Sequence, residues 1–134
     1  MKKKVLFLCT GNSCRSQMAE AIVNSRLGEK WEAVSAGTKP AGYIHPKALA
    51  VLTEIGIQHA GRSKLVNEFR GMDFDLVVTL CDSAVEECPV WLEKGKRVHH
   101  GFPDPVKTGA MADFRKVRDD IAHIIIPLLE AHGN

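Results

Sequence analysis

A chain of 134 residues with 45% hydrophobic and 25% charged residues has the size and composition of one globular domain, and we expect residues 1–134 to form a single domain. This composition excludes a disordered chain, and no segment has the apolar length that a membrane-spanning helix needs. The net charge of +2 is not gathered into a basic stripe, which argues against a nucleic-acid-binding protein.

The first predicted element is a buried strand over residues 5–8, with the three preceding lysines as its solvated start. This apolar run is too short for the hydrophobic part of a secretion signal, and polar residues follow it at once. Without such a signal, cysteines indicate a reducing compartment, where they are more often catalytic or metal-binding than structural. We therefore expect a cytoplasmic protein that uses some of its four cysteines, Cys9, Cys14, Cys81 and Cys88.

Helix and strand patterns alternate along the rest of the chain. Helices are predicted over 17–27, 47–55 and 111–131, and strands over 32–36, 74–80 and 97–100. Gly28 can end the first helix, and Pro127 is expected to kink the last one.

The strands are rich in Val and Leu and are separated by helices, which favours a parallel sheet with right-handed crossovers and helices on both faces. The predicted fold is an α/β three-layer sandwich around a four-stranded parallel sheet. In such folds ligands bind outside the carboxyl ends of the strands. Cys9 and Cys81 each follow a predicted strand, so we expect both thiols at this edge of the sheet.

The loop between the first strand and the first helix carries a Cys-x5-Arg motif in the sequence Cys9-Thr10-Gly11-Asn12-Ser13-Cys14-Arg15-Ser16. A helix N-terminus and a nearby guanidinium favour the thiolate form of a cysteine, which is the nucleophile. The loop N–H groups and Arg15 can also cradle a tetrahedral anion. The loop thus predicts an enzyme whose Cys9 attacks a bound oxyanion.

In the alternative interpretation, Cys9 is only a buried thiol at a strand end, and Gly11 and Asn12 merely turn the chain. The strand before the loop and the helix after it favour the functional interpretation. A nucleotide-binding loop does not fit, because the Gly-Lys-Ser/Thr ending is absent. Asp104 lies between two prolines and is the candidate proton donor for a departing oxygen. In the alternative interpretation, Asp104 is only a turn residue.

Several motifs extend over nearly the whole chain, namely Cys9 to Glu20, Ser35-Ala36-Gly37, Val77 to Cys81, Cys88-Pro89, Asp104-Pro105 and Arg115 to Asp119. Together they resemble the thioredoxin-coupled arsenate reductases, which share the low-molecular-weight protein tyrosine phosphatase fold. The resemblance implies reduction of arsenate to arsenite for arsenic detoxification. It also implies a monomer without a cofactor, with thioredoxin as its reductant and no nucleic-acid or membrane partner.

The resemblance further implies a relay of thiols. Cys9 attacks arsenate, Asp104 protonates the leaving oxygen, and Cys81 attacks Cys9 to release arsenite. Cys88 then attacks Cys81, and thioredoxin reduces the resulting Cys81–Cys88 disulfide.

The resemblance implies that the loop binds the oxyanion. This oxyanion is arsenate, and phosphate or sulfate would compete with it. The residues that would hold it are Thr10, Gly11, Asn12, Ser13, Cys14 and Arg15. Ser16 and Asn12 would help to hold the loop and the Cys9 thiolate, and Cys14 has no part in the relay.

The Cys81–Cys88 disulfide makes a geometric demand. If both residues lie in one helical segment, seven residues span about 10 Å, beyond the roughly 7 Å limit between the Cα atoms of a disulfide. The segment must therefore unwind on oxidation. Asp82, Ser83 and Pro89 make it a weak helix.

Two other function classes fit part of the pattern. A low-molecular-weight protein tyrosine phosphatase is the main alternative, because phosphate and arsenate have nearly the same shape and charge, but such an enzyme does not need Cys81 and Cys88. A zinc-binding module lacks closely paired cysteines or histidines, so we predict no metal ligands. Histidines without a motif, such as His59, are expected to be surface or packing residues.

Several proteins of the resembling family bind a potassium ion beside the loop, through residues that match Asn12, Glu20, Ser35 and an aspartate at position 64. Here position 64 is lysine. Either the Lys64 ammonium takes the place of the ion and pairs with Glu20, or Lys64 is solvated and the ion site is lost.

Overall fold

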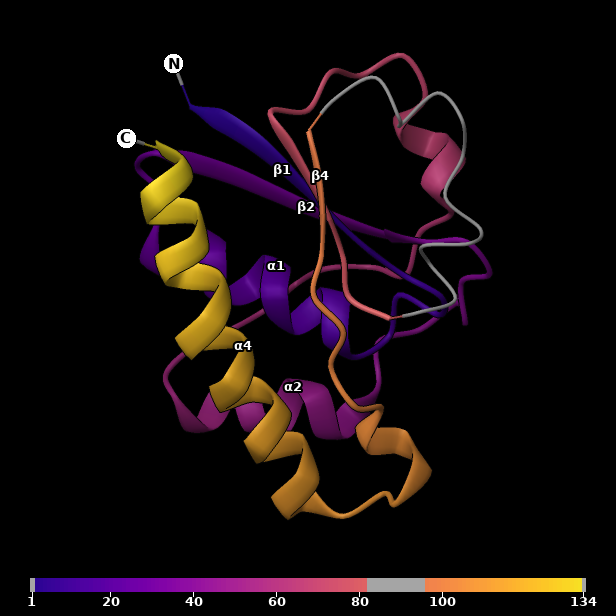
Figure 1. The fold of residues 1–134 in the computed structure, drawn as a ribbon. Coiled ribbons are helices and arrows are strands. Elements are labelled where there is room, and N and C mark those ends of the chain that lie inside the picture. The colour runs from indigo at the N-terminus through magenta and orange to yellow at the C-terminus, as the bar shows by residue number, and fades with distance from the viewer. Residues whose placement is uncertain (1, 82–95, 134) are drawn as a thin grey trace.

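The computed structural model describes residues 2–81 and 96–133 (Figure 1). The strands are β1 (Lys3–Cys9), β2 (Trp31–Gly37), β3 (Leu76–Thr79) and β4 (Arg97–His99), and the α-helices are α1 (Arg15–Arg26), α2 (Pro46–Glu54) and α4 (Met111–Gly133). The described residues also form two short 3-10 helices, η1 (Val66–Phe69) and η3 (Pro105–Lys107). The predicted strands and helices are all present, although β3 is shorter at both ends than predicted, and α4 continues through Pro127 as one helix.

The sheet has the strand order β2-β1-β3-β4, and every neighbouring pair is parallel. Because β1 is central, its carboxyl end has a neighbour on each side. Cys9 pairs with Gly37 of β2, and Leu8 pairs with Thr79 of β3. Cys81 follows β3 closely, so the two thiols lie at the same edge of the sheet, as predicted.

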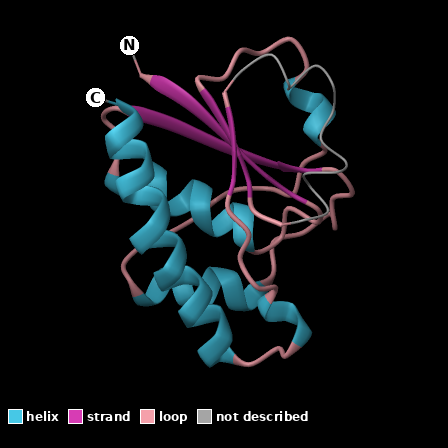
Figure 2. Ribbon diagram, viewed as in Figure 1, coloured by secondary structure: helices cyan, strands magenta, loops and turns pink. Residues whose placement is uncertain are grey.

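Both faces of the sheet are buried, but different elements cover them. Successive strand residues point to opposite faces, so in β1 Val5 and Phe7 join one apolar cluster, whereas Leu6 and Leu8 join the other. The α-helices of the described residues gather on the first face (Figure 2). We expected helices on both faces, and within residues 2–81 and 96–133 the second face packs instead against the 3-10 helix η1, through Val66.

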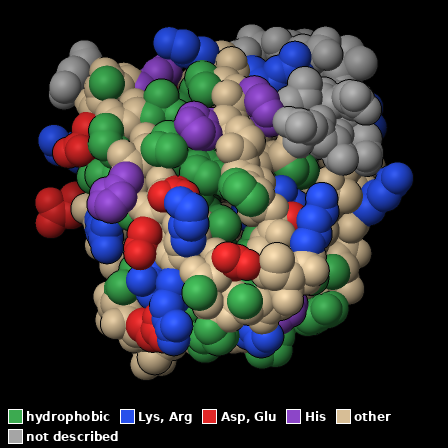
Figure 3. Space-filling model, turned by 60° about the horizontal axis from the view of Figure 1, so that its bottom comes forward, with side chains coloured by type: hydrophobic (Ala, Val, Ile, Leu, Met, Phe, Trp, Pro, Cys, Tyr) green, Lys and Arg blue, Asp and Glu red, His purple; other side chains and the backbone are tan. Residues whose placement is uncertain are grey.

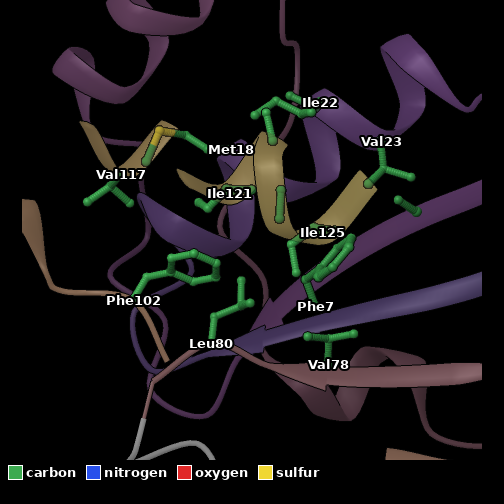
Figure 4. Packing of buried hydrophobic residues seen from close by; sticks show 14 of the residues in the cluster. Phe7, Met18, Ile22, Val23, Val78, Leu80, Phe102, Val117, Ile121 and Ile125 are labelled. Atoms are coloured by element: carbon green, nitrogen blue, oxygen red, sulfur yellow. The ribbon is translucent and has the colours of Figure 1, made fainter. Parts of the chain in front are cut away.

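The larger cluster joins the sheet to α1 and α4. Figure 4 shows Phe7, Val78 and Leu80 of the sheet region facing Met18 and Ile22 of α1 and Val117, Ile121 and Ile125 of α4. Phe102, from the loop after β4, belongs to the same cluster and is only 6% exposed. Burial of this ring anchors the loop that carries Asp104 at the carboxyl edge of the sheet.

Charged side chains join α2 to α4 at the surface. Arg118 is buried against α2, where it donates hydrogen bonds to the Val51 carbonyl at 2.9 Å and to Glu54 at 2.8 Å, and Arg115 binds the same carboxylate. On the face shown in Figure 3, Lys and Arg side chains are interspersed with Asp and Glu. Among the described helices, none has the length and apolar character needed to cross a membrane.

Candidate active site

The loop from Cys9 to Arg15 leaves the carboxyl end of β1 and runs directly into α1. The segment that follows β2 binds the carbonyls of this loop. In chain order, the N–H groups of Thr38, Lys39, Ala41 and His45 donate to the carbonyls of Cys9, Thr10, Gly11 and Ser13, at 2.8 to 3.2 Å. In residues 2–81 and 96–133, the loop N–H groups from Gly11 to Cys14 have no protein acceptor. Successive unused N–H groups beside a helix N-terminus form an arrangement that binds anions.

Asn12 holds the bend of this loop. Its φ of 50° lies in the left-handed region, which asparagine tolerates better than most residues. The side chain is fully buried; its amide donates to the Ser16 hydroxyl at 2.8 Å, and its oxygen accepts from the Lys64 N–H at 2.8 Å and from Gln17 at 3.0 Å. Three directed bonds thus fix a residue in a conformation that costs energy.

Gly37 allows β2 to approach the loop closely. A Cβ at this position would lie 2.3 Å from the Thr10 carbonyl oxygen and 3.1 Å from the Asn12 side chain. The first contact is with backbone, so a larger residue would have to displace the loop itself. This explains why glycine stands at the end of β2.

We expect Gly37→Ala to destabilise the protein by about 1–3 kcal/mol, because the new methyl group overpacks the loop, and to slow turnover of oxyanions. Thermal unfolding and an activity assay would measure the two effects. Gly56→Ala is the matched control, since its φ of 80° makes alanine strained although no atom lies within 4 Å. It should lose stability but keep activity, and an equal loss of activity in both variants would contradict the explanation.

Arg15 and Asp104 meet at the edge of the loop. The Arg15 guanidinium donates to the Phe102 carbonyl at 3.0 Å and lies 4.0 Å from the Asp104 carboxylate. Asp104 also accepts from the Val106 N–H at 3.0 Å, which begins η3. The structure therefore brings both residues to the place that the sequence predicted, beside the loop and partly open to solvent.

The thiols of Cys9 and Cys81 are in contact. They share a hydrogen bond, and the Thr10 hydroxyl lies 3.3 Å from the Cys81 sulfur. Both cysteines are buried, with 3% and 7% of their surface exposed. Two thiols from distant parts of the sequence thus meet on the candidate anion-binding loop.

The pKa of Cys9 is raised above its ordinary value. The hydrogen bond with Cys81 is the main cause and burial is the second, while Arg15 and the Thr10 N–H act in the opposite direction. Sequence reasoning considered only the two groups that lower the pKa of Cys9, and it did not include the neighbouring Cys81 thiol or the burial that raise it.

The other two cysteines differ from this pair. Cys14 is buried, which raises its pKa to about 11 even though the Ser13 hydroxyl lowers it. Cys88, the third predicted member of the relay, lies outside the described residues.

Lys64 lies behind the loop and is buried, with 8% of its surface exposed. Its ammonium donates to the Arg62 carbonyl at 2.7 Å and lies 3.7 Å from Glu20, which accepts at 2.9 Å from Ser35. Lys64 is therefore not a solvated surface residue, and it pairs with Glu20 as the first of the two alternatives predicted. This ammonium would repel a potassium ion placed beside it.

We expect activity and thermal stability to be the same in potassium and in sodium chloride, because the positive charge comes from Lys64. Lys64→Asp should introduce a preference for potassium. Lys64→Ala should lower Tm, since it leaves the Glu20 carboxylate buried without its cation. Potassium stimulation of the unmodified protein would contradict this account of the site.

Sequence reasoning did not single out the residues that contact Gln17 behind the loop. His59 was expected to be a surface or packing residue; its side chain is 9% exposed, and its ring also lies 2.7 Å from the side-chain oxygen of Gln17. Gly61 was not singled out, although the ring fills the space beside it. No short motif marks these residues, because only the fold brings them together.

Comparison with known proteins agrees with this geometry. The family model described as low molecular weight phosphotyrosine protein phosphatase matches residues 4–132. An arsenate reductase from Halalkalibacterium halodurans is 44% identical over 126 residues, which cover 90% of each chain. Another, from Bacillus licheniformis, is 40% identical over 130 residues, covering 92% of this chain and 93% of the relative.

Solved structures of the same fold include both enzyme types. An arsenate reductase in a phosphate-binding state superposes with a TM-score of 0.84 at 30% identity, covering 96% of this chain and 98% of the other. A low molecular weight protein tyrosine phosphatase from T. tengcongensis superposes with a TM-score of 0.80 at 31% identity, covering 97% and 99%. The predicted fold is confirmed.

Proposed function

The chain belongs to the low molecular weight phosphotyrosine protein phosphatase family, and within this family we propose that it is an arsenate reductase. The observation that carries the proposal is the hydrogen-bonded pair of Cys9 and Cys81 on a loop with unused N–H groups. A phosphatase needs one nucleophile, whereas reduction of arsenate needs a second thiol to accept the bond to sulfur. The arsenate reductases that are 40–44% identical support this choice.

The first step joins the Cys9 sulfur to arsenic. The loop N–H groups and Arg15 hold the oxyanion, and its charge makes it a base that can take the proton of the Cys9 thiol. The sulfur attacks arsenic, and one oxygen leaves as water after Asp104 protonates it. A thiol and hydrogen arsenate thus condense to a thiol–arsenate adduct and water, with no change in oxidation state.

The second step is the reduction. The Cys81 sulfur attacks the Cys9 sulfur, and the electron pair of the sulfur–arsenic bond passes to arsenic. Arsenic(V) becomes arsenic(III), which leaves as arsenite, while the two thiols become a Cys9–Cys81 disulfide. The Thr10 hydroxyl, 3.3 Å from the Cys81 sulfur, can hold the attacking group in place.

The last steps regenerate the enzyme. Cys88 attacks Cys81, which frees the Cys9 thiol and moves the disulfide to Cys81–Cys88. The dithiol of thioredoxin then reduces this disulfide. We propose that the enzyme acts as a monomer in the cytoplasm, where thioredoxin is available and structural disulfides are rare.

The remaining loop residues position these groups. The N–H groups of the loop bind the oxyanion, with contributions from Thr10, Gly11, Asn12, Ser13, Cys14 and Arg15. Ser16 and Asn12 act indirectly, because their mutual hydrogen bond of 2.8 Å fixes the bend of the loop. Phosphate and sulfate have the same tetrahedral shape and should compete with arsenate.

Residual phosphatase activity is the second candidate function. Cys9, Arg15 and Asp104 are also the groups that a cysteine-dependent phosphatase needs. The tyrosine phosphatase from T. tengcongensis shares the fold at 31% identity, which supports this activity as a side reaction. Cys81 and Cys88 would have no role in it.

A single-turnover experiment tests the proposed function. Reduced protein mixed with arsenate, without external reductant, should release one arsenite per molecule and lose two thiols, because arsenic(V) takes up two electrons. Arsenite is measured by chromatography with elemental detection, and thiols with a thiol-reactive dye. Phosphate is the control and should cause neither change. Failure to form arsenite would contradict arsenate reduction.

A further inference from the structure

Four side chains that the proposed mechanism does not use form a buried cluster behind the oxyanion loop. They are Gln17 and Glu20 from α1 and His59 and Lys64 from the segment after α2. Gln17 is fully buried, and the side chains of Glu20, His59 and Lys64 are only 9–12% exposed. Polar groups are rarely buried so deeply unless they bind one another or have a function.

The hydrogen bonds of Gln17 connect His59 to the loop. The nitrogen of the Gln17 amide faces three acceptors, namely the Asn12 carbonyl at 3.1 Å, the Asn12 side-chain oxygen at 3.0 Å and the Arg62 carbonyl at 2.8 Å. Its oxygen must then accept a hydrogen bond from the His59 Nε2–H at 2.7 Å. The Nε2–H of His59 therefore holds the oxygen end of the amide whose nitrogen end contacts Asn12.

We propose that His59 is a positioning residue for the oxyanion loop, acting through Gln17 on the strained residue Asn12. This inference rests on the proposed function, because it concerns the loop that binds the oxyanion. If the His59 donor is lost, the Gln17 amide loses the anchor at its oxygen end, and the two contacts of its nitrogen with Asn12, which hold the left-handed bend, are weakened. The loop N–H groups then no longer keep the orientation that binds the anion.

The charges around the ring keep its donor on the correct nitrogen. Glu20 lies 3.6 Å from the His59 Nε2, and Lys64 lies 3.7 Å from Glu20. Burial lowers the pKa of His59, Glu20 acts against this effect, and Lys64 adds to it. A lowered pKa favours the neutral ring, and in that ring the bond to the Gln17 oxygen requires the proton on Nε2.

Gly61 provides the space for this hydrogen bond. A Cβ at Gly61 would lie 2.4 Å from the His59 Nε2 and 2.8 Å from the Gln17 oxygen. Both are the ends of movable side chains, so an alanine would separate the ring from the amide and leave the backbone in place. Gly61→Ala therefore breaks the same bond as His59→Ala without removing either partner.

The test measures binding of inorganic phosphate as protection of Cys9 against iodoacetamide, read on the Cys9 peptide by mass spectrometry. Work is done at 25 °C, well below the Tm of each variant. The variants are His59→Ala, His59→Gln, Gly61→Ala and the His59→Ala/Gly61→Ala double variant. Ile121→Val is the control, because it weakens the core from a fully buried site in α4 and should lower Tm without touching the cluster.

We expect His59→Ala and Gly61→Ala each to weaken phosphate binding about tenfold, the usual effect of leaving a buried acceptor unpaired. The double variant should be no weaker than either, because both changes break one bond. His59→Gln keeps an N–H donor and should bind within about threefold of the unmodified protein.

Three results would overturn the inference. Unchanged phosphate binding in His59→Ala and Gly61→Ala would show that the loop does not depend on His59. An equal loss in Ile121→Val would show that the effect is only one of stability. If phosphate does not protect Cys9 in the unmodified protein, the oxyanion site itself is wrong, and the inference falls with it.

Discussion

The Cys9→Ser variant is expected to lose arsenate reduction and aryl-phosphate hydrolysis completely. Both reactions begin with attack by the same sulfur, and a serine hydroxyl in this buried position is a far weaker nucleophile than a thiol. The replacement is nearly isosteric, so the fold should be kept. Arsenite release and nitrophenyl phosphate hydrolysis measure the two activities, and circular dichroism checks the fold.

The prediction is specific to Cys9, because this residue begins the loop whose N–H groups from Gly11 to Cys14 have no acceptor among the described residues. Either activity above the buffer rate in folded Cys9→Ser would show that the reactions do not share this nucleophile.

The Cys88→Ser variant should be limited to one arsenite per molecule, while its phosphate-ester hydrolysis stays close to normal. In the proposed mechanism the first two steps need only Cys9 and Cys81, and because both cysteines are buried, we expect that thioredoxin does not reach a disulfide between them. The measurement is the number of arsenite molecules released per enzyme molecule in the presence of thioredoxin.

Cys81→Ser is the matched control for this experiment. It lacks the thiol that attacks Cys9, so it should stop at the adduct and release less than one arsenite. Several turnovers by Cys88→Ser with thioredoxin would show that Cys88 is outside the relay.

The fold and the position of the loop could be predicted because local signals agree. The apolar run before Cys9, the small polar residues after it and the helical spacing that follows all specify a strand, a loop and a helix. The start of β3 was less clear. The prediction began this strand at Phe74, but β3 begins at Leu76, and the Asp75 side chain before it accepts from the Lys4 N–H of β1 at 2.7 Å.

The contacts between the side chains of the site could not be predicted from the sequence. The pKa of Cys9 depends on its contact with Cys81, which is 72 residues away in the chain and reaches Cys9 only because β1 and β3 pair. The link from His59 through Gln17 to Asn12 likewise depends on side-chain directions that no spacing encodes. For Lys64, the sequence posed two alternatives, and its burial beside Glu20 decided between them.

The most direct test of the proposed relay is the reductant that sustains turnover of the unmodified enzyme. Arsenate-dependent oxidation of NADPH is followed with thioredoxin and thioredoxin reductase, and in parallel with glutaredoxin, glutathione and glutathione reductase. A relay that ends in a Cys81–Cys88 disulfide predicts sustained turnover with thioredoxin and little with glutaredoxin. Turnover with glutaredoxin alone would contradict the three-cysteine relay.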